Sequence, residues 1–192
     1  MTETPNPNIV DTDTITGEMH PIRRAVISIG SNLGERRTNL QGAVDSLADT
    51  PEVWLTAVSP VYETDPVDAP EGSREYLNAI VLLDTTLSAR TLLERAHAVE
   101  SAYGRDRDAE SERNSPRTLD VDLIVVGDRR ADEPDLQLPH PRAHERGFVL
   151  VPWLDLEPDA ELPDAGPVAE LVEKTGRDGI RLREDIELEH QG

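Results

Sequence analysis

Short apolar runs alternate along the chain with stretches of helical spacing. Residues 25–30 are apolar and β-branched and end in glycine, which is typical of a buried strand. Four apolar residues then recur at i, i+3, i+4 and i+7, so the pattern predicts a helix over residues 35–48. The strand pattern returns over residues 53–64, where Pro60 interrupts it, as expected of an edge strand or a bulged one.

The second half repeats this alternation. Residues 75–85 are almost continuously apolar, as a central strand would be, and Asn78 is the exception. Ser88 is placed to cap a helix whose apolar spacing ends at a glycine. Residues 119–127 predict another strand, and residues 148–156 predict a further helix.

The order β-α-β-β-α-β predicts an α+β fold of the ferredoxin-like (βαββαβ) type, with additional C-terminal elements. In such a fold an antiparallel sheet carries both helices on one face, which leaves the other face for loops and a ligand. A single domain over residues 22–176 is expected from the length of 192 residues. Residues 1–21 are predicted to be a flexible N-terminal tail, and residues 177–192 an acidic C-terminal tail with at most a loosely attached strand or helix.

Composition narrows the range of functions. The chain has 39 acidic and 19 basic side chains and a net charge of -20, which disfavours nucleic-acid and membrane partners. Cysteine is absent, so disulfides, thiolate nucleophiles and Cys-ligated zinc are excluded. No apolar stretch approaches the roughly 18 residues of a membrane span, and no signal peptide is recognisable, so a cytoplasmic protein is expected.

Two carboxylates interrupt the apolar strand at residues 119–127. Side chains two residues apart on a strand point to the same face about 6 to 7 Å apart, so Asp120 and Asp122 converge while Leu119, Val121 and Leu123 pack on the other side. Hard oxygen ligands without His or Cys favour magnesium or manganese, with two ions where phosphates complete their shells. The alternative is a solvated strand face.

Arginines are concentrated just before this strand. Arg105, Arg107, Arg113 and Arg117 lie within thirteen residues of a chain whose single lysine is Lys174. The guanidinium fork matches phosphate oxygens, and a cationic loop beside a carboxylate pair suits polyphosphate transfer. The alternative is a solvated loop in which acidic residues alternate with the arginines.

An amide beside an aromatic residue on a predicted strand would suit a flat heterocycle with lactam and amino groups. Asn78 shares a strand face with Tyr76 and Ile80, so an amide that donates and accepts lies beside an aromatic ring. The alternative is an amide satisfied by neighbouring backbone. Residues 139–148 combine two histidines, two arginines and the single phenylalanine of the chain. The glycine-rich turn at residues 30–34 matches neither a P-loop nor a dinucleotide fingerprint and is interpreted as structural.

With these residues in view, the chain resembles the 6-hydroxymethyl-7,8-dihydropterin pyrophosphokinase family over about residues 25–163. The resemblance is carried, in order, by IGSNLG, SPVYETDPV, EYLNAIVLL, ESAYGRDR, PRTLDVDLIVVG and LPHPRAHERGFVLVPW. It implies a ferredoxin-like enzyme, expected to be a monomer, that transfers diphosphate from ATP to 6-hydroxymethyl-7,8-dihydropterin in folate biosynthesis with two Mg²⁺ ions.

The resemblance also implies roles for individual residues. Asp120 and Asp122 would hold both metals and, with Arg105 and Arg117, form the catalytic set. The ATP-binding residues would be Glu100, Arg105, Arg107, Arg117, Leu123, His140 and Arg146. The pterin would lie between the rings of Tyr76 and Phe148, in contact with Asn78, Asp120 and the loop that contains Thr64 and Val67.

One departure and two alternatives accompany this interpretation. Many relatives carry Trp-Gly where this chain has Asn114-Ser115, so an aromatic residue of the closing loop is missing. A nuclease or nucleotidyl transferase would use the same aspartates, but the net charge disfavours its substrate. A non-catalytic ferredoxin-like small-ligand-binding module would explain the fold without chemistry, and magnesium-dependent ATP binding separates it from the enzyme.

Overall fold

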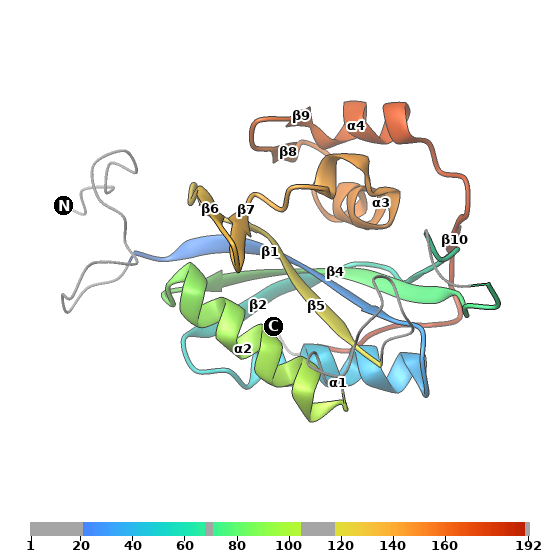
Figure 1. The fold of residues 1–192 in the computed structure, drawn as a ribbon, viewed down its shortest axis with the longest axis horizontal. Helices are drawn as coiled ribbons and strands as arrows, with labels where there is room; N and C mark the ends of the chain where they lie inside the picture. The colour runs from blue at the N-terminus through green and yellow to red at the C-terminus, as the bar shows by residue number, and fades with distance from the viewer. Residues whose placement is uncertain (1–20, 68–70, 105–117, 191–192) are drawn as a thin grey trace.

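An antiparallel sheet forms the centre of the computed structural model, which describes residues 21–67, 71–104 and 118–190 (Figure 1). Its strands are β1 (Arg23–Ser31), β2 (Val53–Val58), β3 (Tyr62–Thr64), β4 (Tyr76–Thr85), β5 (Asp120–Val126) and β10 (Ile180–Leu182). They follow the order β10-β3-β4-β1-β5, and β2 pairs with β4 beside β3. The strands predicted from apolar runs are confirmed, and Pro60 falls in the break between β2 and β3.

Two helices cover one face of this sheet. They are α1 (Arg36–Ala48) and α2 (Ala89–Ala102), which lie together below the strands in Figure 1. Their apolar faces bury Leu40, Leu47 and Leu92 against Ile27 and Ile29 of β1. As predicted, Ser88 caps α2, because its side-chain oxygen accepts a hydrogen bond from the Thr91 N–H at 3.1 Å. The main core therefore lies between these helices and the sheet.

The opposite face is only partly open. Helix α3 (Gly147–Leu156) packs on it and buries Val26 and Ile80 together with Leu150 and Trp153, and helix α4 (Val168–Thr175) packs against α3. The helix predicted over residues 148–156 is confirmed, whereas α4 was not predicted. The part of this face that α3 leaves uncovered is where the sheet carries its polar residues.

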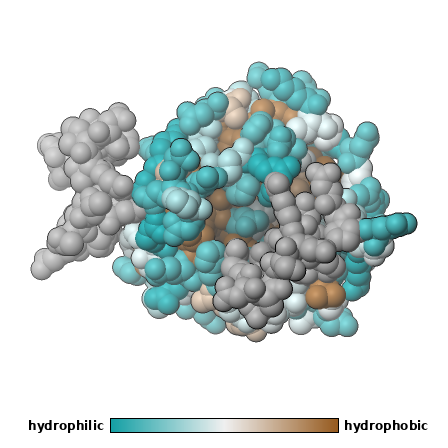
Figure 2. Space-filling model, viewed as in Figure 1, coloured by the Kyte–Doolittle hydropathy of each residue, from teal (hydrophilic) through white to brown (hydrophobic). Residues whose placement is uncertain are grey.

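Short elements complete the described chain. Hairpins join β6 (Ala131–Glu133) to β7 (Leu136–Leu138) and β8 (Glu161–Leu162) to β9 (Gly166–Pro167), and a 3-10 turn, η2, spans Ala143–Glu145. Within residues 21–67, 71–104 and 118–190, no helix has the length and apolar character needed to cross a bilayer. Hydrophilic residues dominate the face shown in Figure 2, in keeping with the net charge of -20.

The C-terminal segment is more firmly attached than the sequence suggests. β10 extends the sheet by pairing with β3, and Leu188 is only 7% exposed in the main core. The side chain of Gln41 on α1 donates to the Glu189 carbonyl at 2.7 Å and accepts from its N–H at 2.8 Å. A segment with few apolar residues packs here because strand pairing and these side-chain bonds satisfy its backbone.

Gly42 marks a close approach of the two core helices. A Cβ at this position would lie 1.8 Å from the hydroxyl oxygen of Tyr103, at the end of α2. We expect Gly42→Ala to lower the free energy of unfolding by about 1 to 3 kcal/mol, because overpacking outweighs the gain in helix propensity. Urea denaturation measures this. In a Tyr103→Ala background the same change is expected to stabilise; a stabilising effect in the wild type would contradict the packing.

Candidate active site

A cavity of about 320 Å³ opens on the polar part of the second sheet face. Its floor is made by three neighbouring strands. The register places Gly30 of β1 between Asn78 of β4 and Asp120 of β5, and places Ser28 beside Asp122. All five residues line the cavity. The amide of Asn78 on β4 and the two carboxylates on β5 therefore share one floor.

The two aspartates lie as the strand pattern predicts. Asp120 and Asp122 are half-buried on the cavity side, whereas Val121 and Leu123 are buried in the main core. The described part of the chain contains no cluster of three or more His, Cys, Asp or Glu side chains arranged to hold a metal ion. A cation at this pair would therefore take its other ligands from water or from a bound anion.

Arg146 faces this carboxylate pair from the segment that precedes α3. Burial lowers the pKa of Arg146, and the charges of Asp122 and Asp120 act in the opposite direction. Its guanidinium carbon lies 5.5 Å from the centroid of the Phe148 ring, within the range of a cation–π contact. Arg146 thus places positive charge between the aspartates and the aromatic wall of the cavity.

Two aromatic rings and an oriented amide make the other end of the cavity. Tyr76 and Phe148 both line it. The Asn78 amide nitrogen donates to the Thr64 hydroxyl at 2.6 Å, which fixes the orientation of the buried amide. A Cβ on Gly30 would lie 2.7 Å from the side-chain carbonyl oxygen (Oδ1) of Asn78. The partner of Asn78 is therefore a side chain, and Gly30 leaves room for the amide.

The segment after β3 forms a further wall. Thr64, Asp65 and Val67 line the cavity, and Val67 is 57% exposed although it is apolar. On the opposite side the lining comes from residues 142–148, including Arg142 and Glu145, which form an ion pair at 2.8 Å. Apolar and polar groups thus surround a space of the size that small-molecule sites require.

Two of the residues expected to bind nucleotide support the site from behind. The buried Glu100 carboxylate accepts a hydrogen bond from the Val121 N–H at 3.0 Å, between the two aspartates in sequence. The Leu123 side chain is buried in the main core, so contact with a ligand on the cavity side would have to come from its backbone. Glu100 and Leu123 do not line the cavity.

His140 lies outside the cavity lining but next to it in sequence and structure. Its backbone N–H donates to the Ile124 carbonyl of β5 at 2.9 Å, and its ring Nδ1 accepts from the backbone N–H of Arg142 at 3.2 Å. Burial, with the positive charges of Arg146 and Arg142, lowers the pKa of His140 to about 4. The ring is therefore neutral near pH 7 and carries its proton on Nε2.

This neutral histidine makes stability depend on pH. Between about pH 6.5 and 4 the unfolded chain binds a proton at His140 that the folded chain does not, so stability falls as the pH is lowered through this window. From pH 7 to pH 5 we expect the wild type to lose about 1 to 2 kcal/mol more than His140→Asn. Urea unfolding at both pH values measures this, with the exposed His144→Asn as matched control. Equal losses in wild type and His140→Asn would contradict the burial of the ring.

Some expected site residues cannot be placed. Arg105, Arg107, Arg113, Arg117 and the Asn114-Ser115 pair lie outside the described residues. Although some lie within the segments 64–67 and 139–148, other lining residues had no individual role assigned from the sequence. These are Ser28, Gly30, Asp65, Arg142, Glu145 and Gly147. Ser28 and Gly30 had a detectable signal, because both alternate with the apolar residues of a predicted strand.

Comparison with known proteins gives a consistent result. A model of the 7,8-dihydro-6-hydroxymethylpterin-pyrophosphokinase (HPPK) family matches residues 26–158. The 2-amino-4-hydroxy-6-hydroxymethyldihydropteridine pyrophosphokinase of Pseudomonas aeruginosa is 40% identical over 159 residues, which cover 83% of this chain and 96% of that protein. The Mycobacterium tuberculosis protein of the same name is 42% identical over 175 residues, with 83% and 89% covered.

Solved structures show the same fold in a more distant protein. Wild-type Plasmodium falciparum HPPK-DHPS, crystallised with pterin and p-hydroxybenzoate, matches with a TM-score of 0.62 at 13% identity. The match covers 82% of this chain and 44% of that one, so this chain spans less than half of the larger protein. At this identity the likeness concerns the fold alone.

Proposed function

This chain belongs to the 7,8-dihydro-6-hydroxymethylpterin-pyrophosphokinase family, and from that membership we propose that it transfers the diphosphate of ATP to 6-hydroxymethyl-7,8-dihydropterin. The products are AMP and the pterin diphosphate, an intermediate of folate biosynthesis. One observation carries the assignment at the level of the site. A single cavity joins a carboxylate pair to an aromatic wall with an oriented amide, which are the groups that a metal-bound polyphosphate and a flat heterocycle require.

The carboxylate pair fits magnesium. Asp120 and Asp122 offer hard oxygen ligands on one strand face, and among the residues that the structure describes no His or Cys lines the cavity beside them. Two carboxylates leave most of the octahedral shell to water and phosphate oxygens, as Mg²⁺ prefers when it binds nucleotides. We assign both aspartates to two magnesium ions bound together with ATP. Bound magnesium would supply neutralisation of the charge that develops on the phosphate oxygens.

The aromatic end fits the pterin. Tyr76 and Phe148 offer rings for stacking, and the oriented Asn78 amide presents its carbonyl oxygen at the cavity floor. Asp120 lies on the other side of Gly30, between this end and Asp122, and the segment with Thr64 and Val67 closes the pterin edge. We propose that the pterin hydroxymethyl group points toward the aspartates and the ATP β-phosphorus, which the position of Asp120 beside Gly30 supports.

Positive charge for the phosphates comes from the opposite wall. Arg146 already lies in the field of both aspartates and is assigned to ATP, with His140 beside it. Arg105 and Arg117 are assigned to the triphosphate from sequence, with Arg107, Glu100 and the Leu123 backbone in supporting positions. These residues would orient the pterin hydroxyl for attack on the β-phosphorus. As the new P–O bond forms, the bond to the α,β-bridging oxygen breaks, AMP leaves with that oxygen, and the hydroxyl proton is released to solvent.

The type of sheet, the oligomeric state with its location, and the extent of the domain belong to the same proposal. We propose a ferredoxin-like sheet, which the strand order supports when β2 and β3 are counted as one interrupted strand and β10 as an addition at that edge. A monomer in the cytoplasm, without nucleic-acid or membrane partners, is proposed from the family resemblance and the net charge of -20. One domain is proposed over residues 22–176, and the β3–β10 pairing and the Gln41–Glu189 bonds extend its packed part toward residue 190.

The assignment is tested by AMP release. Purified protein with ATP and Mg²⁺ is expected to form AMP only when 6-hydroxymethyl-7,8-dihydropterin is added, and omission of Mg²⁺ is expected to abolish it. Release of ADP, or hydrolysis of ATP that ignores the pterin, would overturn the proposed reaction. Binding of ATP or the pterin without turnover would instead favour a non-catalytic ligand-binding module.

A further inference from the structure

Arg181, on β10, bridges carboxylates from two separate segments of the cavity wall. Its guanidinium contacts Asp65 at 3.0 Å, immediately after β3, and Glu75 at 3.4 Å, immediately before β4. It also lies 3.9 Å from Glu63. The side chain is 46% exposed, so it lies at the rim of the molecule rather than in the core.

Both segments that Arg181 joins end at cavity-lining residues. Asp65 itself lines the cavity and lies between Thr64 and the exposed Val67. Glu75 precedes Tyr76, one of the two ring walls. Movement of either carboxylate away from Arg181 would therefore carry a wall residue with it.

The backbone strengthens this connection. β10 pairs with β3 in a register that places Ile180 opposite Thr64, and the Asp65 N–H donates to the Gly179 carbonyl at 3.0 Å. Thr64 in turn accepts the hydrogen bond that orients Asn78. A continuous series of contacts thus runs from the C-terminal segment to the amide on the cavity floor.

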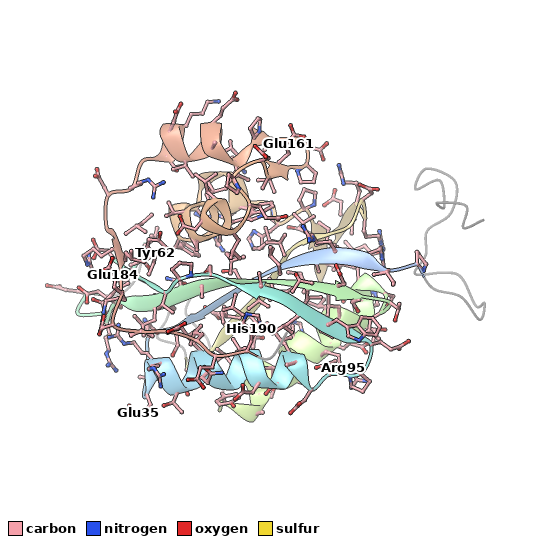
Figure 3. All side chains as sticks on the ribbon, turned by 180° about the vertical axis from the view of Figure 1, so that it is seen from behind. Glu35, Tyr62, Arg95, Glu161, Glu184 and His190 are labelled. Carbon is pink, nitrogen blue, oxygen red and sulfur yellow. The ribbon has the colours of Figure 1, made fainter. Side chains whose placement is uncertain are left out.

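The C-terminal segment is itself held in place on both sides of Arg181. Arg183 and Arg36 donate to the same oxygen of Glu63, at 3.0 and 2.8 Å, which ties β10 and α1 to β3. Figure 3 shows the segment at the sheet edge, with Glu184 near Tyr62, and then reaching the α1 side of the sheet at His190. The family match ends at residue 158, so Arg181 lies beyond it, whereas the carboxylates that it contacts lie within it.

We propose that Arg181 is a positioning residue for pterin binding, which holds Asp65 and Glu75 together and so sets the separation of the Thr64–Val67 wall from Tyr76. The inference rests on the proposed function for the identity of the ligand. The geometry by itself assigns Arg181 to the walls of the aromatic end rather than to the carboxylate end, where the nucleotide would bind.

The size of the effect follows from the exposure of the ion pairs. Exposed salt bridges contribute little individually, so loss of this three-carboxylate contact is expected to weaken pterin binding roughly 3- to 10-fold rather than abolish it. The pterin ring carries no net charge near pH 7. The affinity for the pterin should therefore fall with ionic strength chiefly when the Arg181 ion pairs are needed to keep the cavity walls in place, because salt screens exposed ion pairs.

Isothermal titration calorimetry of the full-length protein, with Mg²⁺ and a non-cleavable α,β-methylene analogue of ATP, measures this directly. Arg181→Ala is expected to raise the Kd for 6-hydroxymethyl-7,8-dihydropterin roughly 3- to 10-fold and to leave the Kd of the analogue unchanged. Arg181→Lys should recover only part of the loss, because an ammonium group does not bridge two carboxylates with a planar fork. The Kd of the wild type should rise between 50 and 500 mM NaCl, and that of Arg181→Ala should rise less.

Arg90→Ala is the matched control, because Arg90 is 43% exposed and likewise bridges two carboxylates, Glu133 and Asp135, but lies away from the cavity. It should leave pterin affinity unchanged. In a double-mutant cycle, Asp65→Asn should add little to the effect of Arg181→Ala, since each change removes the same Arg181–Asp65 contact. Equal pterin affinity in wild type and Arg181→Ala, or an equal loss in Arg90→Ala, would overturn the inference. A wild type that binds the analogue but no pterin would instead contradict the proposed function.

Discussion

Replacement of Asp120 or Asp122 by alanine is expected to lower kcat at least about 1,000-fold, because each change removes a charged ligand from the site of phosphoryl transfer. The fold should survive, since both side chains are only half-buried and removal of one relieves repulsion within the pair. AMP release in the presence of the pterin measures the activity, and thermal unfolding measures the fold.

The matched control for these variants is Asp84→Ala. Asp84 is a partly exposed aspartate on β4 of the same sheet, outside the cavity lining. It should retain wild-type activity. Near-normal turnover in both Asp120→Ala and Asp122→Ala would contradict the metal assignment, and Asn variants that keep the side-chain shape would then show whether charge matters at all.

The second large effect is expected at Asn78. Asn78→Ala removes the oriented amide from the cavity floor, so kcat/KM for the pterin should fall about 100-fold, whereas the KM for ATP should change little. A site built to hydrogen-bond a heterocycle loses affinity when a buried partner disappears. Steady-state kinetics with each substrate varied in turn separates the effect on kcat/KM for the pterin from the effect on KM for ATP.

Thr64→Val provides the companion measurement. It keeps the Asn78 amide but removes the hydroxyl that accepts its hydrogen bond at 2.6 Å. A smaller loss, roughly 10-fold in kcat/KM for the pterin, is expected because the amide remains but loses its fixed orientation. An unchanged pterin KM in Asn78→Ala would show that the pterin lies elsewhere.

The strand elements could be predicted because β1 and β4 are continuous apolar runs buried on both faces, whereas the first half of β5 alternates between buried and half-buried residues. Asp120 and Asp122 alternate with Val121 and Leu123, so their shared face was readable without coordinates, and the structure places it on the cavity. Asn78 was conspicuous because it interrupts an apolar run. Its bond to Thr64 was not predictable, since that depends on the register between β3 and β4.

The C-terminal region shows where sequence reasoning stops. Residues 177–190 look like a polar tail, and their attachment depends on contacts with residues more than a hundred positions away, such as Asp65 and Gln41. Local composition carries no trace of such contacts. For Ser28 and Gly30 the alternation with apolar residues was visible in the sequence, but their position between Asn78 and the two aspartates follows from strand register.

The most direct test of the central claim is identification of the product by mass spectrometry and ³¹P NMR after incubation with ATP, Mg²⁺ and 6-hydroxymethyl-7,8-dihydropterin. We expect a pterin that has gained two phosphoryl groups as one diphosphate, in a 1:1 ratio with AMP, and no such product with Asp122→Ala. A pterin monophosphate with ADP, or an unmodified pterin beside hydrolysed ATP, would contradict it.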